Sequence, residues 1–189
     1  MLESIEKIDT ALFLFLNSAF SCTALNYFFV AITDPSFWII PGAVVAVYFL
    51  IKHKRKAFII IGLSLITVAI SDPFSSQVVK PLINRDRPCH PDSMIIEKTH
   101  TLMGLKGSNS FPSSHATNMF AQAMLFSLLY PALWVVFFGF AGLIGFSRIY
   151  VGVHFPGDVL SGSLLGIVIG ISVFLIYKYL SNFLSKTTE

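Results

Sequence analysis

Long apolar runs, separated by short polar connections, dominate the chain. Each run approaches the roughly 20 residues that a transmembrane helix needs, and prolines stand near the run ends or at possible kinks, where helices start, stop or bend. The apolar runs cover about residues 8–32, 37–50, 57–79, 114–130, 132–146 and 159–180. This pattern predicts an all-α integral membrane bundle of about six transmembrane helices.

The composition agrees with a membrane protein and excludes other classes. Of the 189 residues, 54% are hydrophobic and 12% are charged, whereas soluble domains carry about 25% charged residues. A net charge of +3 is too small to indicate a nucleic-acid-binding protein. Two cysteines, Cys22 and Cys89, are too few for a disulfide scaffold or a typical structural zinc site. Because no internal repeat appears, we expect residues 1–189 to form a single membrane domain.

The first apolar run is interrupted near residues 21–23. It predicts either a broken span or an interfacial helix followed by a short membrane segment. A secretory leader would need a positively charged start, but the first ten residues hold Glu3, Glu6, Lys7 and Asp9. We therefore expect no cleavage in this segment.

The basic residues 52–56, KHKRK, fix the expected orientation. Short basic connections lie in the cytoplasm by the positive-inside rule. Counting spans outward from this connection places residues 80–112 and 147–158 together on the outer face. Both chain ends are then cytoplasmic if the first run spans.

Three polar clusters stand at the outer ends of these runs, where ionisable residues are costly. They are residues 80–88 (KPLINRDRP), 111–117 (FPSSHAT) and 147–158 (SRIYVGVHFPGD). Taken singly, the basic residues fit snorkelling to lipid headgroups, and a serine or Asp158 fits a helix N-cap. His115 and His154, each alone, fit packing residues at the interface.

Taken together on one membrane face, the clusters suit phosphoryl transfer. Three cations can converge on one anion: Lys80, Arg87 and Arg148. A helix N-terminus there presents the backbone N–H groups of Ser113 and Ser114, which completes a phosphate cradle. One histidine can attack phosphorus and the other can protonate the leaving group. Asp158, four residues after His154, can hold a ring N–H of that histidine.

These residues resemble the signature of the type 2 phosphatidic acid phosphatase superfamily. In that family a lysine, six residues and Arg-Pro are followed by Pro-Ser-Gly-His, and then by Ser-Arg, five residues, His, three residues and Asp. This sequence reads Lys80, six residues, Arg87-Pro88; Pro112-Ser113-Ser114-His115; and Ser147-Arg148, five residues, His154, three residues, Asp158. Ser114 departs from the usual glycine, which bears on how closely the backbone approaches the phosphate.

The resemblance implies a six-helix membrane phosphatase that needs no metal and no other cofactor. By this likeness His154 is the nucleophile that forms a phosphohistidine intermediate, Asp158 orients it, and His115 is the general acid. The implied phosphate-binding residues are Lys80, Arg87, Ser113, Ser114 and Arg148. The sequence agrees, because the three cations can meet the charge that a metal would otherwise neutralise.

The expected substrate is a lipid phosphate that stays in the membrane. Likeness to compact bacterial members of the family favours lipid A 1-phosphate first, beside phosphatidylglycerophosphate and undecaprenyl pyrophosphate. It also implies the bacterial cytoplasmic (inner) membrane, with the active site facing the periplasm or exterior. Membrane lipids are expected neighbours, and neither a nucleic-acid nor a protein partner is implied. Two alternatives stay open: a phosphotransferase with a lipid or sugar acceptor, and a non-catalytic lipid transporter.

The outer-face loop at residues 81–111 is expected to carry part of the active site, since long connections in compact proteins are often functional. Its candidates for contacting a large anionic headgroup are Arg85, His90, Lys98, His100, Lys106 and Asn109; the alternative is that each is simply solvated. Asp72 lies about two helical turns before Lys80. We expect it to pair with a motif cation or to cap a kink at Pro73.

Overall fold

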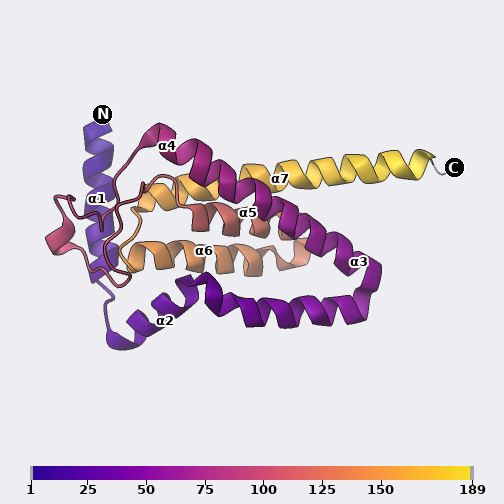
Figure 1. Cartoon of the computed structure of the whole chain (residues 1–189), viewed down its shortest axis with the longest axis horizontal. Coiled ribbons are helices and arrows are strands. Elements are labelled where there is room, and N and C mark those ends of the chain that lie inside the picture. The colour runs from indigo at the N-terminus through magenta and orange to yellow at the C-terminus, as the bar shows by residue number, and fades with distance from the viewer. Residues whose placement is uncertain (1, 188–189) are drawn as a thin grey trace.

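The computed structural model describes residues 2–187, which form a helical bundle without β-strands in that range. Its helices are α1 (Leu2–Ser18), α2 (Thr23–Thr33), α3 (Ile39–Pro73), α4 (Lys80–Ile83), α5 (Ser114–Leu129), α6 (Trp134–Tyr150) and α7 (Pro156–Thr187). In Figure 1, α3, α5, α6 and α7 run alongside one another, and the long connection between α4 and α5 covers one end. We call this end the loop end, and the opposite end, where α7 finishes, the tail end.

The element α3 is two helices joined at Lys54. This residue has φ 33° and ψ −107°, values that no helix contains, and the chain reverses direction there (Figure 1). The predicted runs at residues 37–50 and 57–79 are therefore the two arms of one helical hairpin. The basic connection predicted between them forms the bend, at the tail end.

Helix length and exposed apolar surface support a membrane-integral bundle. Three described stretches are long and apolar enough to cross a membrane, Pro35–Ile83, Pro131–Tyr150 and Pro156–Lys186, and the bent pair Glu3–Ser18 and Thr23–Thr33 makes a possible fourth. With 16 residues, α5 is about 24 Å long, short of the roughly 30 Å hydrocarbon core. The all-α membrane bundle is thus confirmed, whereas the predicted count of six spans is not.

Small residues let α5 and α7 pack at close range. Gly162, Gly166 and Gly170 line one face of α7, and a Cβ on any of them would come within 2.6 Å of a backbone carbonyl oxygen of α5 or of its N-cap residue. Glycines spaced four residues apart permit such backbone contact between membrane helices. This packing holds the first turns of α5 and α7 together, and both turns carry motif residues.

Asp72 pairs with an amide instead of a motif cation. Asn118 Nδ2 on α5 donates to Asp72 Oδ1 at 2.9 Å, and the Ser71 hydroxyl donates to Asn118 Oδ1 at 2.7 Å. Directly after Pro73 the chain forms a π-helix, Phe74–Val79. The Asp72 contact therefore braces α3 against α5 just before this irregular turn, which leads into Lys80.

The first apolar run does not form a straight span, because α1 and α2 meet at an angle of 115°. Asn17 Nδ2 donates to the carbonyl oxygen of Tyr150 at 2.8 Å, at the end of α6, and Asp9 Oδ1 accepts from Gly157 N at 2.7 Å, at the start of α7. These contacts lay α1 across the loop end (Figure 1). The prediction that both chain ends share one side is not confirmed, because α1 starts at the loop end and α7 finishes at the tail end.

We expect the Gly166→Ala substitution to destabilise the protein, because the added methyl group must push α5 away from α7. Overpacking typically costs about 1–3 kcal/mol. The matched control is Gly142→Ala on α6, where an added Cβ meets no atom within 4 Å. Thermal unfolding in detergent should show a lower Tm for Gly166→Ala only; equal Tm values for the two variants would contradict close packing at this glycine.

Candidate active site

The three predicted clusters meet at the loop end. The backbone N–H of Ser113 donates to the carbonyl oxygen of Asp158 at 3.0 Å, which joins the start of α5 to the start of α7. Arg87, from the loop after α4, donates through Nη1 to the carbonyl oxygen of Val153 at 3.0 Å, in the turn between α6 and α7. Segments more than 60 residues apart in the chain thus surround His154.

His154 is 1% exposed and has a different partner on each ring nitrogen. Its Nδ1 lies 3.4 Å from Asp158 Oδ2 and 3.3 Å from the Ser110 hydroxyl, and its Nε2 lies 3.1 Å from Arg87 Nη1. A guanidinium can only donate hydrogen bonds, so Nε2 must present its lone pair and Nδ1 must carry the proton. This tautomer is the one that leaves Nε2 as a nucleophile.

Burial, followed by the positive charges of Arg87, Arg148 and Lys80, holds the pKa of His154 well below its ordinary value. A low pKa keeps the imidazole neutral at physiological pH, as nucleophilic attack requires.

Asp158 is fully buried and is held by donors on both carboxylate oxygens. Arg85 Nη1 donates to Oδ1 at 2.8 Å, and the Phe155 backbone N–H donates to Oδ2 at 2.8 Å. The Ser110 hydroxyl also donates to Oδ2. With its own proton directed to Asp158, Ser110 Oγ is free to accept the Nδ1 proton of His154. The carboxylate thereby fixes the ring both directly and through Ser110.

Three cations whose charges act on His154 are anchored by the backbone and by neutral side chains. Lys80 Nζ donates to the carbonyl oxygen of Asn109 at 3.2 Å, Arg87 Nε to that of Ser108 at 2.9 Å, and Arg148 Nη1 to the Thr33 hydroxyl at 2.6 Å. Burial lowers the pKa of the Arg87 guanidinium from its ordinary value. None of these contacts neutralises a positive charge, so this cluster of cations attracts an anion.

Two buried polar atoms at this site have no hydrogen-bond partner among the described residues. They are Arg148 Nε and His115 Nε2. Buried polar atoms are normally paired, and an unpaired one calls for a specific explanation. Both belong to residues that the sequence assigned to one phosphate site, and a bound phosphoryl group would supply the missing acceptor for Arg148.

The start of α5 fits the predicted cradle only in part. Ser113 caps the helix, and its hydroxyl accepts from Ala116 N at 3.5 Å. Its own backbone N–H is occupied by the carbonyl oxygen of Asp158. This N–H is therefore already paired in the structure, and the phosphate contacts of Ser113 and Ser114 stay predictions.

The residues predicted to contact an anionic headgroup take different roles in the structure. Arg85 points inward, bridging Asp9 and Asp158, and Asn109 braces Lys80. Burial, and then the charges of Arg148 and Arg87, lower the pKa of Lys106, which adds a fourth cation near the pocket. The remaining three lie outside the contacts described for the site: His90 bonds within its own turn, Lys98 is exposed, and His100 meets Ser21.

Sequence reasoning missed Ser110 and Asp9 as parts of the site. Ser110 stands only three residues before Ser113, so its nearness to a motif was a usable signal. Asp9 lies 148 residues from Gly157, the residue whose N–H it accepts. No periodicity or spacing links such distant positions.

Comparison with known proteins shows the family. The profile of the PAP2 superfamily matches residues 57–182. The chain belongs to the PAP2 superfamily. Matched relatives of this superfamily include lipid A phosphatases and an undecaprenyl-diphosphatase, and this chain is a phosphatase of the same superfamily.

Its relatives include lipid A phosphatases. The lipid A 4'-phosphatases of Bacteroides thetaiotaomicron and Porphyromonas gingivalis are 31% and 33% identical to it, over 88% and 94% of this chain and 75% and 76% of their own. The crystal structure of Aquifex aeolicus LpxE is similar with a TM-score of 0.65 and 27% identity, covering 87% of this chain and 93% of that one.

We expect Ser110→Ala to lower kcat about tenfold or more while changing KM little, because Asp158 loses a donor and His154 loses an acceptor. A hydrogen bond to a charged group contributes about 1.5–3 kcal/mol, and each 1.36 kcal/mol is tenfold in rate. Ser163→Ala is the control, since this buried hydroxyl only caps the Val159 carbonyl of its own helix. Steady-state phosphate release measures both, and equal kcat values would show that Ser110 does not support catalysis.

Proposed function

We propose that this phosphatase removes a phosphate from a membrane lipid, lipid A first of all, through a phosphohistidine on His154. The observation that carries the proposal is the pair of unpartnered buried atoms, Arg148 Nε and His115 Nε2, beside a neutral His154. This chemistry requires a group that binds the phosphate, a nucleophile and a general acid. Arg148, His154 and His115 meet these requirements in that order.

The first step transfers the phosphoryl group to the enzyme. The negative charge of the bound phosphate offsets the surrounding cations and allows His115 to take up a proton. His154 Nε2 then attacks phosphorus, the bond from phosphorus to the lipid oxygen breaks, and the protonated His115 gives its proton to the departing oxygen. The incoming phosphate must first displace Arg87 Nη1, which lies 3.1 Å from Nε2. Arg87 then donates to a phosphoryl oxygen instead, together with Lys80 and Arg148.

The second step returns the enzyme to its starting state. A water attacks phosphorus, the bond from phosphorus to His154 Nε2 breaks, and His115 accepts the water's proton. Inorganic phosphate leaves. Asp158 keeps the Nδ1 proton in place throughout, so that the charge that develops on the ring during attack is balanced by a fixed carboxylate.

A lipid substrate suits the position of the pocket. The site lies where a bundle with apolar outer faces ends, so a phosphate attached to a lipid reaches it without leaving the membrane. The basic bend at Lys54 lies at the other end, which supports an active site on the periplasmic or outer face of the inner membrane. On this reading α1 lies in the interface, and α5 and the two arms of α3 complete the membrane core.

Among lipid phosphates, lipid A is the substrate that the relatives favour, and the matched 4'-phosphatases make its 4'-phosphate the first candidate, ahead of the 1-phosphate expected from sequence. Purified protein should be assayed against lipid A, phosphatidylglycerophosphate and undecaprenyl pyrophosphate, with mass spectrometry of the remaining lipid. We expect lipid A to lose one phosphate fastest. Faster turnover of either other lipid, or no action on lipid A, would contradict the assignment.

His154→Ala should abolish phosphate release from every lipid in that panel, because it removes the nitrogen that forms the bond to phosphorus. The variant must elute and melt like the parent protein in detergent, which separates lost chemistry from lost folding. Turnover retained within about tenfold of the parent would exclude His154 as the nucleophile.

Activity should survive chelation, because Lys80, Arg87 and Arg148 supply the positive charge. Treatment with EDTA followed by dialysis should leave kcat unchanged. A loss of activity that added Mg²⁺ restores would instead indicate a metal-dependent reaction.

A further inference from the structure

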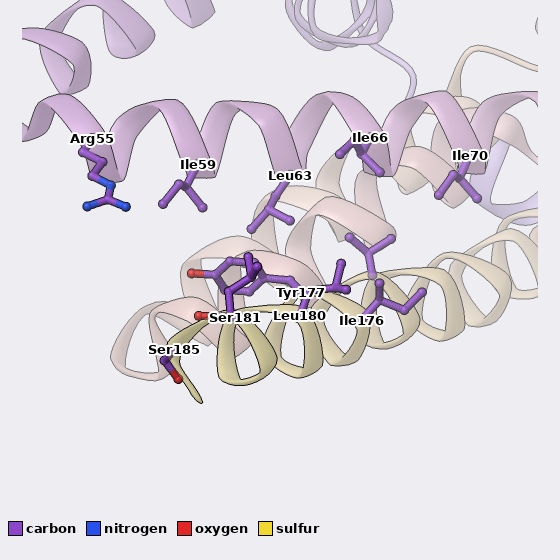
Figure 2. A pocket seen from close by; sticks show the side chains of 12 residues that line it. Arg55, Ile59, Leu63, Ile66, Ile70, Ile176, Tyr177, Leu180, Ser181 and Ser185 are labelled. Atoms are coloured by element: carbon purple, nitrogen blue, oxygen red, sulfur yellow. The ribbon is translucent and has the colours of Figure 1, made fainter. Parts of the chain in front are cut away.

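An open groove runs along the bundle far from the active site, between the second arm of α3 and the C-terminal half of α7 (Figure 2). Its volume is about 660 Å³, within the roughly 300–1,000 Å³ of small-molecule sites. Its walls are mostly aliphatic, with Ile59, Ile66 and Ile70 from α3 facing Ile176 and Leu180 from α7. The apolar walls suit a hydrocarbon chain.

One end of this groove is polar. Arg55, Tyr177 and Ser181 gather there, and their side chains lie toward the same end in Figure 2. Within residues 2–187, none of these three side chains has a hydrogen bond or an ion pair. The Tyr177 ring packs against apolar neighbours, but its hydroxyl has no partner in that range. A guanidinium and two hydroxyls are therefore available to a ligand.

The surrounding charge is uniformly positive. The bend carries Lys52, Lys54 and Lys56 beside Arg55, and α7 adds Lys178 and Lys186. No Asp or Glu occurs in residues 35–71 or 159–187. A ligand with an anionic head and a hydrocarbon tail matches both parts of the groove.

We propose that the groove binds one anionic phospholipid of the surrounding leaflet. One acyl chain lies between α3 and α7, and the phosphate accepts from Arg55, Tyr177 and Ser181. Arginine suits phosphate through its paired donors, and basic pockets between membrane helices bind anionic headgroups. Such a lipid bridges α3 and α7, so it stabilises the folded bundle.

The test compares lipids and variants by thermal unfolding in detergent micelles. Adding phosphatidylglycerol should raise the Tm of the parent by about 5 °C, and phosphatidylcholine should raise it less. Arg55→Gln should lose this difference. Lys56→Gln, which removes the same charge from a residue outside the groove lining, should keep it.

A second variant checks the acyl-chain part of the site. Ile66→Trp fills the groove from a half-exposed position and leaves Arg55 intact, and it should also lose the phosphatidylglycerol effect. Equal shifts with the two lipids, or equal losses in Arg55→Gln and Lys56→Gln, would overturn the proposal. A lipid-free dimer in light scattering that Ile66→Trp dissociates would also overturn it, by making a second copy the occupant.

An independent observation concerns α1, all of which precedes the matched family region. Asp9 Oδ2 lies 2.8 Å from Arg85 Nη2, while Arg85 Nη1 lies 2.8 Å from Asp158 Oδ1. Asp9 Oδ1 also accepts from the Gly157 N–H at 2.7 Å. A Cβ at position 157 would lie 2.8 Å from Asp9 Oδ2, so a larger residue there would displace this carboxylate.

We infer that Asp9 is a positioning residue that acts through Arg85 and the first turn of α7, an inference that rests on the proposed function. Arg85 stacks on the Phe155 ring, with Cζ 4.0 Å from its centroid, so its guanidinium is held between Asp9, Asp158 and an aromatic face. Without Asp9 the arginine loses one of its two carboxylates. Asp158 then holds His154 less rigidly.

Asp9→Asn keeps the acceptor for Gly157 and removes the charge opposite Arg85. It should lower kcat about tenfold with an unchanged KM, and Asp9→Glu should recover part of the loss. The double variant Asp9→Asn/Arg85→Gln should be no slower than Arg85→Gln alone, because Asp9 acts through Arg85. Glu6→Gln, on the exposed side of the same helix, is the control and should match the parent.

A kcat for Asp9→Asn equal to that of Glu6→Gln, or a fully additive double variant, would overturn this inference. An active His154→Ala would contradict the proposed function, regardless of the kcat of Asp9→Asn. An inactive His154→Ala beside an unaffected Asp9→Asn would overturn the role of Asp9 alone.

Discussion

Uncompensated positive charge at the loop end is the constraint on which the site depends. Arg87 and Arg148 are 7% and 4% exposed, and Lys80 and Lys106 lie close by. The buried carboxylate of Asp158 is already paired with Arg85. Burying a charge without a partner is costly. The pocket therefore favours occupation by an anion, and a phosphate with several negative oxygens satisfies more of these donors than a single carboxylate.

The rest of the bundle holds this unfavourable arrangement together. Glycines of α7 allow α5 to approach closely, which fixes the first turn of each helix beside the other. The polar pairs Asp72–Asn118 and Ser64–Gln122 join α3 to α5 within the bundle. Across the loop end, α1 closes the set through Asn17 and Asp9. The favourable free energy of this helix packing thus offsets the electrostatic repulsion among the four cations.

Much of this arrangement could be predicted from the sequence, because hydrophobic runs and motif spacing are local signals. The six runs fall on helices, and the parity of those runs brings Arg87, His115 and His154 to one end. The chain reverses at Lys54, inside the basic connection that the sequence predicted. Long-range pairings gave no such signal: the position of α1, the role of Asp9 and the inward turn of Arg85 depend on tertiary contacts. The hydrogen bond from the Ser113 N–H to the carbonyl oxygen of Asp158 is another long-range contact that the sequence does not indicate.

The central claim is that the phosphoryl group passes through Nε2 of His154, and the most direct measurement is to trap it there. Protein mixed rapidly with ³²P-labelled lipid A should be quenched in alkali, where a phosphohistidine survives, and digested for mass spectrometry. The label is predicted on the peptide containing His154 at early times, and it should be absent from His154→Ala. Label on another residue, or full-rate phosphate release with no labelled peptide, would contradict the claim.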